Sequence, residues 1–229
     1  MSNLVNAQNN LPAIWLREKI SGFASAVISI VPSGYEAYCR LLHPAYFDES
    51  GNLLSVGWQR LFSDAGICID KTSQWESIIS TLGEHTSLHC NPPLEGSLEE
   101  GYYKAMIEVL KNHTNTPEKI WFGIWVGYES VCEVYKLAPT FSLLGRDYYL
   151  LSGNLTQSQR SLCRGPFYQS ANIFWPDDRA WCVGSDVDLK SSYISASESA
   201  VHELMIQFAG EAFRVDPHDS ITLNMKSLS

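Results

Sequence analysis

The sequence predicts a single α+β domain in which a mainly antiparallel or mixed sheet packs with three to four helices. Two observations lead to this prediction. Segments with strand character come in groups separated by helices and long loops, without the regular alternation that builds a parallel sheet. The chain has 229 residues, 45% of them hydrophobic and 12% aromatic, which is enough for one sizeable core.

The N-terminal part of the chain predicts a loose end followed by a hairpin. Residues 1–10 are polar and rich in asparagine, so we expect a disordered N-terminus there and a single domain over 11–229. Residues 26–31 and 35–42 have strand character and flank a Pro-Ser-Gly turn. This pattern predicts a β-hairpin.

Three helices are predicted in the middle of the chain. Apolar residues recur at helical spacing over 58–65 and, more weakly, over 74–82. The strongest pattern covers 98–111, where Ser97 and Glu100 form a capping box, in which each side chain satisfies a free backbone N–H of the first turn.

The segment over 120–126 predicts the central strand. Its unbroken apolar run is typical of a strand covered on both faces, and the two-residue repeat places Trp121 and Trp125 on the same face. We expect Trp125 to be part of the core. Further strands are predicted over 148–151, 171–175 and 180–189.

The C-terminal part predicts a last helix and a closing strand. The helix covers 196–209, with Ser195 and Glu198 as its capping box and Gly210 as its stop. Residues 213–215 follow as a short strand that closes the sheet.

The charge and the cysteine pattern exclude several classes of partner. The formal net charge is −9 and no block of Lys or Arg exists, so neither nucleic acid nor an anionic membrane surface is an expected partner. The chain starts without the basic segment of a signal peptide, and its six cysteines are scattered. We therefore expect a cytoplasmic protein with reduced thiols.

The common catalytic signatures are absent. There is no phosphate-binding loop, no dinucleotide fingerprint and no nucleophile elbow. His202-Glu203 starts like a zinc-protease motif, but Ile206 stands where the second His is required. We assign no catalytic residue, no metal and no cofactor.

Two groups leave metal binding open. His85, His89 and Cys90 have a spacing that suits a metal if the segment is helical, or they belong to an ordinary polar loop. Asp186 and Asp188 are expected on one face of the strand over 180–189, where they bind a cation or form a solvated strand end.

Six residues are candidates for binding a ligand or a partner: Arg40, His43, Arg146, Trp175, Asp178 and Arg179. In the segment from Trp175 to Val183, two Trp rings around an Asp-Arg pair either clamp a ligand or belong to a structural turn. We expect the structural role, in which the Arg179 guanidinium contacts a neighbouring carboxylate through two of its nitrogens. Both Arg179→Lys and Asp178→Asn are then expected to melt lower.

Several short segments of the sequence, taken together, resemble a family of uncharacterised bacterial proteins. The resemblance extends from about Ser29 to Asp219 and departs at Tyr193-Ile194-Ser195-Ala196-Ser197, where relatives tend to have Gly-Gly-Ser. It implies one domain and no particular reaction. The segments that carry it are Val31-Pro32-Ser33-Gly34-Tyr35-Glu36-Ala37-Tyr38, His43-Pro44, Trp121-Phe122-Gly123-Ile124-Trp125, Arg146-Asp147-Tyr148-Tyr149, and Trp175-Pro176-Asp177-Asp178-Arg179-Ala180-Trp181-Cys182-Val183.

Two classes of function agree with these observations. The first is a non-enzymatic binding protein, such as a partner-neutralising or immunity-type module, and we prefer it because the chain is acidic, rich in aromatic residues and without a catalytic signature. The second is a small-molecule-binding protein or hydrolase whose Arg, His and Asp residues converge in one pocket. Convergence in a concave pocket with perturbed titratable groups favours the second class, and a flat aromatic patch favours the first.

Overall fold

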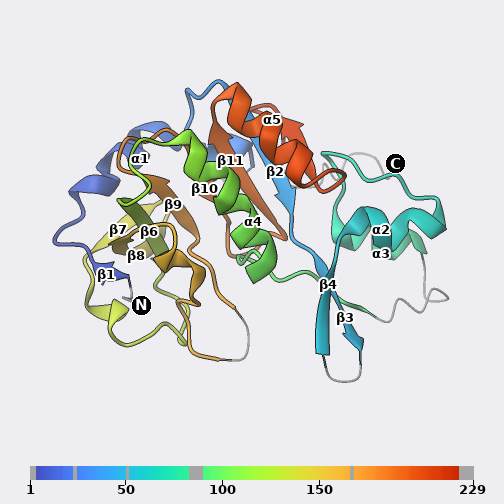
Figure 1. Ribbon diagram of the computed structural model, residues 1–229, viewed down its shortest axis with the longest axis horizontal. Coiled ribbons are helices and arrows are strands. Elements are labelled where there is room, and N and C mark those ends of the chain that lie inside the picture. The colour runs from blue at the N-terminus through green and yellow to red at the C-terminus, as the bar shows by residue number, and fades with distance from the viewer. Residues whose placement is uncertain (1–3, 23–24, 50–51, 83–89, 166–167, 222–229) are drawn as a thin grey trace.

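In the part of the chain that the structure describes, nine strands form one antiparallel sheet, which carries most of the core. A computed structural model describes residues 4–22, 25–49, 52–82, 90–165 and 168–221 (Figure 1). The strands of the large sheet are β1 (Val5–Asn6), β2 (Ala37–Leu42), β6 (Ile120–Trp125), β7 (Thr140–Leu143), β8 (Arg146–Gly153), β9 (Ile173–Pro176), β10 (Cys182–Gly184), β11 (Ser191–Ala196) and β12 (Ala212–Val215).

The strand order is β1-β8-β6-β9-β10-β11-β2-β12, and β7 pairs with β8 next to β1. Every pair of strands is antiparallel. Strands from the two ends of the chain meet in this sheet, because β2 lies between β11 and β12. The predicted α+β class with a mainly antiparallel sheet is confirmed.

Five α-helices occur in the described chain: α1 (Ile14–Lys19), α2 (Trp58–Phe62), α3 (Trp75–Leu82), α4 (Glu100–Leu110) and α5 (Glu198–Gln207). Helices α4 and α5 cover one face of the large sheet, where their apolar residues join the main core cluster (Figure 1). Helix α1 and the N-terminal segment cover the other face, where Trp15 and Leu16 pack near Trp175.

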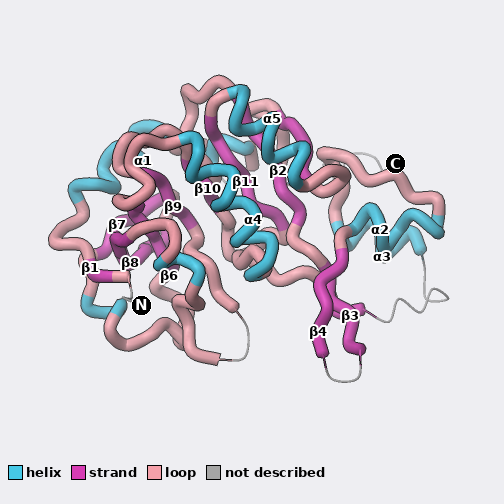
Figure 2. Tube along the Cα trace, in the orientation of Figure 1, coloured by secondary structure: helices cyan, strands magenta, loops and turns pink. Residues whose placement is uncertain are grey.

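A smaller sheet forms an arm beside the main body (Figure 2). Its strands run in the order β4-β3-β5, with bounds β3 (Ala45–Glu49), β4 (Asn52–Val56) and β5 (Cys90–Asn91). One face of the arm packs against α2 and α3 through Ala45 and Val56, in a cluster that contains Trp58. The Glu211 carboxylate ties α2 to the main body by accepting hydrogen bonds from the backbone N–H groups of Trp58 and Gln59 at 3.0 and 2.9 Å.

The four predicted helices are present, but both capping boxes are wrong. The side chain that accepts a hydrogen bond at the start of α4 belongs to Glu99, whereas Ser97 donates to the carbonyl of Tyr168. At the start of α5 the cap is Ser197, and Ser195 is a buried residue of β11. Each true cap is two residues after the predicted Ser, because the adjoining segments remain extended.

Two predictions for the N-terminal part are also wrong. Residues 26–31 contain a 3-10 turn (Val27–Ser29) instead of a strand, and β2 pairs with β11 and β12 instead of forming a hairpin. The N-terminus is not disordered over residues 4–10, since Val5–Asn6 pair with β8. Asparagine side chains hold this segment: the Asn6 amide donates to the carbonyl of Val134 and the Asn10 amide to that of Thr140.

Strand β6 lies inside the sheet between β8 and β9, as predicted. Trp121 and Trp125 pack against the same apolar cluster, also as predicted. Both are only partly buried, so the expectation that Trp125 is a core residue is wrong. Its ring lies 5.8 Å from the guanidinium of Arg146 and meets Tyr128 edge-on, at the border between core and surface.

Candidate functional site

The six candidate residues lie at two separate places, near the two ends of β9. Trp175, Asp178 and Arg179 lie at its C-terminal end, in or next to the turn that leads to β10. Arg40 and His43 contact the first two residues of β11, and Arg146 contacts the turn that joins β10 to β11. The structure therefore does not bring all six into one pocket.

The two Trp rings of the first group do not form a clamp. Trp175 and Trp181 are 1% and 0% exposed and belong to different core clusters. The Asp178 carboxylate is a structural acceptor: it takes hydrogen bonds from Thr114 Oγ1 at 2.9 Å, from the backbone N–H of Asn115 at 2.7 Å and from that of Ala180 at 3.1 Å. It joins the turn after β9 to the loop after α4.

Arg179 departs from the predicted role. Its guanidinium makes no ion pair with a carboxylate of the described chain and lies over the ring of Trp15, 4.9 Å from the centroid. Its φ of 55° places it in the left-handed region, which suits the tight turn. The expected two-nitrogen contact with a carboxylate is wrong, because Asp178 is occupied by the neighbouring loop.

These contacts predict different results for the two substitutions in this turn. Asp178→Asn should lower the free energy of unfolding by about 1–2 kcal/mol, because an amide replaces an acceptor of several hydrogen bonds. Arg179→Lys should change it by less than about 0.5 kcal/mol, since the exposed cation keeps its charge near Trp15. Urea denaturation measures both, and equal losses for the two variants would contradict this assignment.

Arg40 and His43 are buried next to strand β11. Arg40 is 3% exposed and donates to Ser191 Oγ at 3.0 Å and to the backbone carbonyl of Lys71 at 2.9 Å, so it joins the large sheet to the segment before α3. His43 is fully buried, with Nδ1 2.7 Å from the carbonyl of Leu94 and Nε2 2.9 Å from Ser192 Oγ.

The burial of His43 determines its charge. Burial lowers the pKa of His43 to about 4, and the positive charges of Arg40 and Lys190 also lower it, against the effect of the Leu94 carbonyl. At neutral pH the ring is therefore neutral; it donates from Nδ1 to Leu94 and accepts at Nε2 from Ser192. Ser192 Oγ lies 2.5 Å from Ser185 Oγ, which lines a small surface recess.

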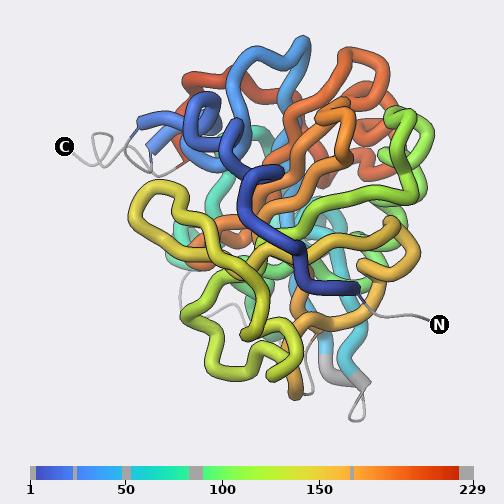
Figure 3. Tube along the Cα trace, turned by 90° about the vertical axis from the view of Figure 1, so that its left-hand side faces the viewer, coloured from blue at the N-terminus to red at the C-terminus, as the bar shows by residue number. Residues whose placement is uncertain are grey.

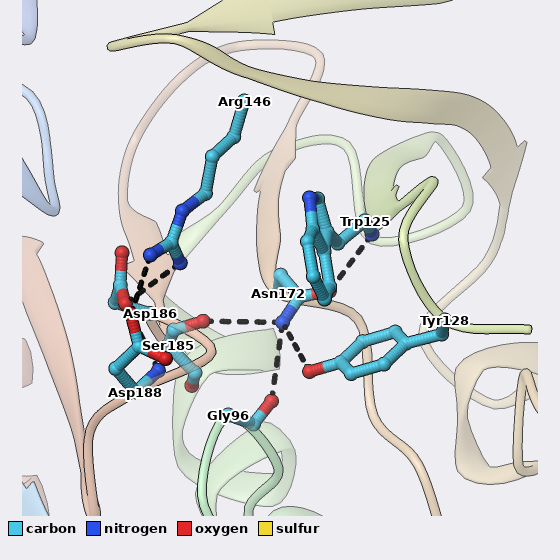
Figure 4. Close-up of polar contacts among 8 residues, drawn as sticks. All are labelled: Gly96, Trp125, Tyr128, Arg146, Asn172, Ser185, Asp186 and Asp188. Carbon is cyan, nitrogen blue, oxygen red and sulfur yellow. Dashed lines mark hydrogen bonds and ion pairs between the residues drawn. The ribbon is translucent and has the colours of Figure 1, made fainter.

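Arg146 is the candidate residue that reaches this recess. The recess has a volume of about 130 Å³, and its walls combine polar groups of Asn172, Ser185 and Asp186 with the apolar side chain of Leu144. Figure 4 shows the two carboxylates that hold the guanidinium: Nη1 is 2.9 Å from Asp186 Oδ1, and Nη2 is 2.5 Å from Asp188 Oδ2.

Asp186 and Asp188 were expected on one face of a strand, and this is wrong. Strand β10 ends at Gly184, and both aspartates lie in the following turn, where the N–H of Asp188 donates to Asp186 Oδ1. Their two carboxylates more than neutralise Arg146, so the three residues together carry one net negative charge.

Asn172 organises the recess, and the sequence analysis missed it. This residue is 3% exposed. Its side-chain oxygen accepts from the N–H of Trp125 at 2.9 Å, and its amide nitrogen lies within 3.3 Å of the Gly96 carbonyl, the Tyr128 hydroxyl and the Ser185 carbonyl (Figure 4). A polar residue directly before the apolar run of β9 was the signal in the sequence.

Six exposed aliphatic side chains lie on two adjoining segments of the chain, residues 5–14 and 134–144. The described chain exposes nine large hydrophobic side chains, and six lie on the N-terminal segment or on the segment beneath it, from 47% exposed for Ile14 to 81% for Leu137. Figure 3 shows the N-terminal segment crossing in front of residues 134–150. We call this surface the N-terminal face; its members are Val5, Leu11, Ile14, Val134, Leu137 and Leu144.

The N-terminal face is continuous with the recess. The side-chain hydrogen bonds of Asn6 and Asn10 fix the N-terminal segment along 134–140, and Arg17 Nε donates to the carbonyl of Ser142. Leu144 belongs to both surfaces, because it is 51% exposed and also lines the recess. An aliphatic surface therefore ends at a small polar recess that contains Arg146.

The remaining expectations on metals lie partly outside the described residues. His85 and His89 are among residues 83–89, which the structure does not describe, and Cys90 is half-buried in β5. No group of three or more His, Cys, Asp or Glu side chains within the described ranges could hold a metal ion. All six cysteines are free.

Within the same ranges, no helix is long and apolar enough to cross a lipid bilayer. A comparison of the chain with protein-family models, with curated proteins and with solved structures found no match in any of the three.

Proposed function

We propose that this chain is a cytoplasmic, non-enzymatic binding protein that binds a protein partner through its N-terminal face. The observation that carries the proposal is the concentration of six of the nine exposed large hydrophobic residues on that face. Scattered exposed hydrophobic residues are ordinary, but a contiguous patch on a folded chain is typical of an interaction surface. The six free thiols agree with a reducing compartment.

The recess at the edge of this face gives the proposed interface a polar anchor. Arg146 is half-buried between two carboxylates and a Trp ring, so its guanidinium is held in one position. Pre-positioned polar groups beside an apolar surface provide specificity at low entropic cost. A volume of 130 Å³ suits a small side chain of a partner.

A hydrolase or small-molecule site receives less support from the same geometry. Of the predicted pocket residues, Arg40 and His43 are buried with their polar atoms bonded inside the protein, and Asp178 and Arg179 lie at the other end of β9. Only Arg146 lines the recess, and it is neutralised by carboxylates.

The experiment uses two matched single substitutions of exposed aliphatic residues. Leu137 is on the N-terminal face and is 81% exposed; Ile206, on α5, is 65% exposed and lies outside that face. Wild-type protein captures its partner from a lysate of cells that express it, and the partner is then purified and its Kd measured. We expect Leu137→Asp to weaken binding by about tenfold or more and Ile206→Asp by less than about twofold.

Equal affinities of wild type and Leu137→Asp for the purified partner would contradict the proposal. Circular dichroism and melting curves of both variants check that each retains the wild-type fold, which is expected because both side chains are exposed.

A further inference from the structure

A second concave site lies between the arm and the start of α4, away from the N-terminal face. This cavity has a volume of about 480 Å³, within the range of about 300–1,000 Å³ that is usual for small-molecule sites. In Figure 1 the arm strands β3 and β4 lie on the opposite side of the molecule from β1 and β7. We call it the arm cavity.

The pleat of the arm determines which side chains reach this cavity. Tyr46 lies opposite Ser55 in β4 and opposite Asn91 in β5, so Tyr46, Leu53 and Asn91 share one face of the arm. The other face carries Ala45 and Val56 into the core cluster beneath α2 and α3. The first face therefore remains for the cavity, and these three side chains line it.

The opposite wall is acidic and aromatic. It consists of Glu99 and Glu100 at the start of α4 together with Tyr168, whose ring packs against Tyr103 at 5.9 Å. None of the described residues that line the arm cavity is Lys, Arg or His. The cavity thus combines two tyrosine rings and apolar side chains with negative charge only.

The surroundings of the cavity raise the pKa values of both tyrosines that line it. Burial raises the pKa of Tyr46 and of Tyr168, and the negative charge of Glu99 raises both further, so both hydroxyls stay neutral in the physiological range. Glu99 Oε2 accepts from the N–H of Tyr102, while Glu100 pairs with Lys104 on the exposed side of the helix at 2.6 Å. Such an exposed pair is weak, so the Glu100 carboxylate can also receive a second cation.

We propose that the arm cavity binds an organic cation, namely an alkylammonium or guanidinium group carried on a compact apolar body. Aromatic faces and carboxylates attract a cation together, and the side chains of Leu53 and Leu94 in the lining cover its apolar part. The cavity disfavours anions, because its lining contains two glutamates and no positive side chain, and Lys104 outside the lining pairs only with Glu100.

The test compares cations with neutral compounds of the same shape, by calorimetry at neutral pH. One arm uses phenethylamine, its neutral isostere 2-phenylethanol and the anion hydrocinnamate; the other uses the blocked amino acids N-acetyl-arginine amide and N-acetyl-citrulline amide. We expect each cation to bind about tenfold more tightly than its neutral counterpart and hydrocinnamate not to bind. The tighter of the two cations shows whether a free amine or a basic side chain is the better ligand.

Two glutamates of α4 provide the matched control. Glu100→Gln removes a cavity carboxylate and its pair with Lys104, whereas Glu108→Gln removes a carboxylate and its pair with Lys111 outside the cavity. We expect Glu100→Gln to weaken binding of the cation about fivefold or more and Glu108→Gln less than about twofold. Leu53→Ser, at an exposed position of the arm, should weaken binding without affecting the helix.

Equal affinities for charged and neutral probes would overturn the proposal, as would no heat of binding from either cation at millimolar concentration. Binding that neither Glu100→Gln nor Leu53→Ser weakens would place the cation elsewhere and would also overturn it. Because the arm cavity and the N-terminal face are separate, these results do not depend on the partner proposed above.

Discussion

Replacing Asn172 with aspartate is expected to lower the free energy of unfolding by about 3–5 kcal/mol at neutral pH. The substitution conserves shape, so the loss comes from the missing hydrogen bonds and from the buried charge instead of from a cavity. In the wild type the amide nitrogen faces three oxygen atoms, those of Gly96, Tyr128 and Ser185. A carboxylate would place a buried negative charge against two carbonyl oxygens that cannot donate.

Urea denaturation and thermal melting measure this effect, which corresponds to a fall in Tm of roughly 10 °C for a chain of this size. Asn112→Asp is the control, because Asn112 is exposed and makes one long hydrogen bond to its own helix. A near-wild-type Tm for Asn172→Asp would show that residue 172 does not hold the recess together.

The second large effect concerns acid stability. The pKa of His43 is about 4 in the folded protein and 6.5 in the unfolded chain, so between these values the unfolded state binds a proton that the folded state does not. Stability from the neutral ring is fully present above pH 6.5 and is lost as the pH falls towards 4. The difference corresponds to about 3 kcal/mol.

The contribution of His43 is isolated by comparing the wild type with His43→Gln. Glutamine does not titrate, so the free energy of unfolding of this variant should fall less between pH 7 and pH 4.5. His218→Gln serves as the control, since His218 is exposed. Burial raises the pKa of Glu211, so the contribution of this residue to stability increases as the pH falls. This contribution is the same in the wild type and in His43→Gln, so it cancels in the comparison. Parallel pH profiles for wild type and His43→Gln would contradict the assignment.

The elements that the sequence predicted well are those with a strong local pattern. Helices α4 and α5 and the apolar strand β6 have such patterns, and all three are present. Strand β11 was missed although all six of its residues are buried, because Ser191, Ser192 and Ser195 interrupt any apolar run. A serine that bonds Arg40 or His43 inside the protein looks like a surface residue in the sequence.

The candidate site was less predictable because it depends on contacts between distant segments. Arg146 and His43 were singled out for their chemistry, but the turn that holds Arg146 was predicted as part of a strand, and the strand that contacts His43, β11, was not predicted. Asp178 and Arg179 are adjacent in sequence and suggested a pair. The hydrogen-bond donors to Asp178 instead come from the loop after α4, and the group beneath the Arg179 guanidinium is the ring of Trp15.

The position of β2 has a consequence for how the chain reaches its fold. Both neighbours of β2 come from segments near the other end of the sequence, 191–196 and 212–215, and all six of its residues are buried in the final sheet. Pairing over such a separation requires the closure of a long loop, which slows folding. On the ribosome β2 emerges roughly ten seconds before either neighbour, at common rates of synthesis. During that time the apolar residues of β2 are exposed and accessible to chaperones. In a chain truncated before β11 they would remain exposed.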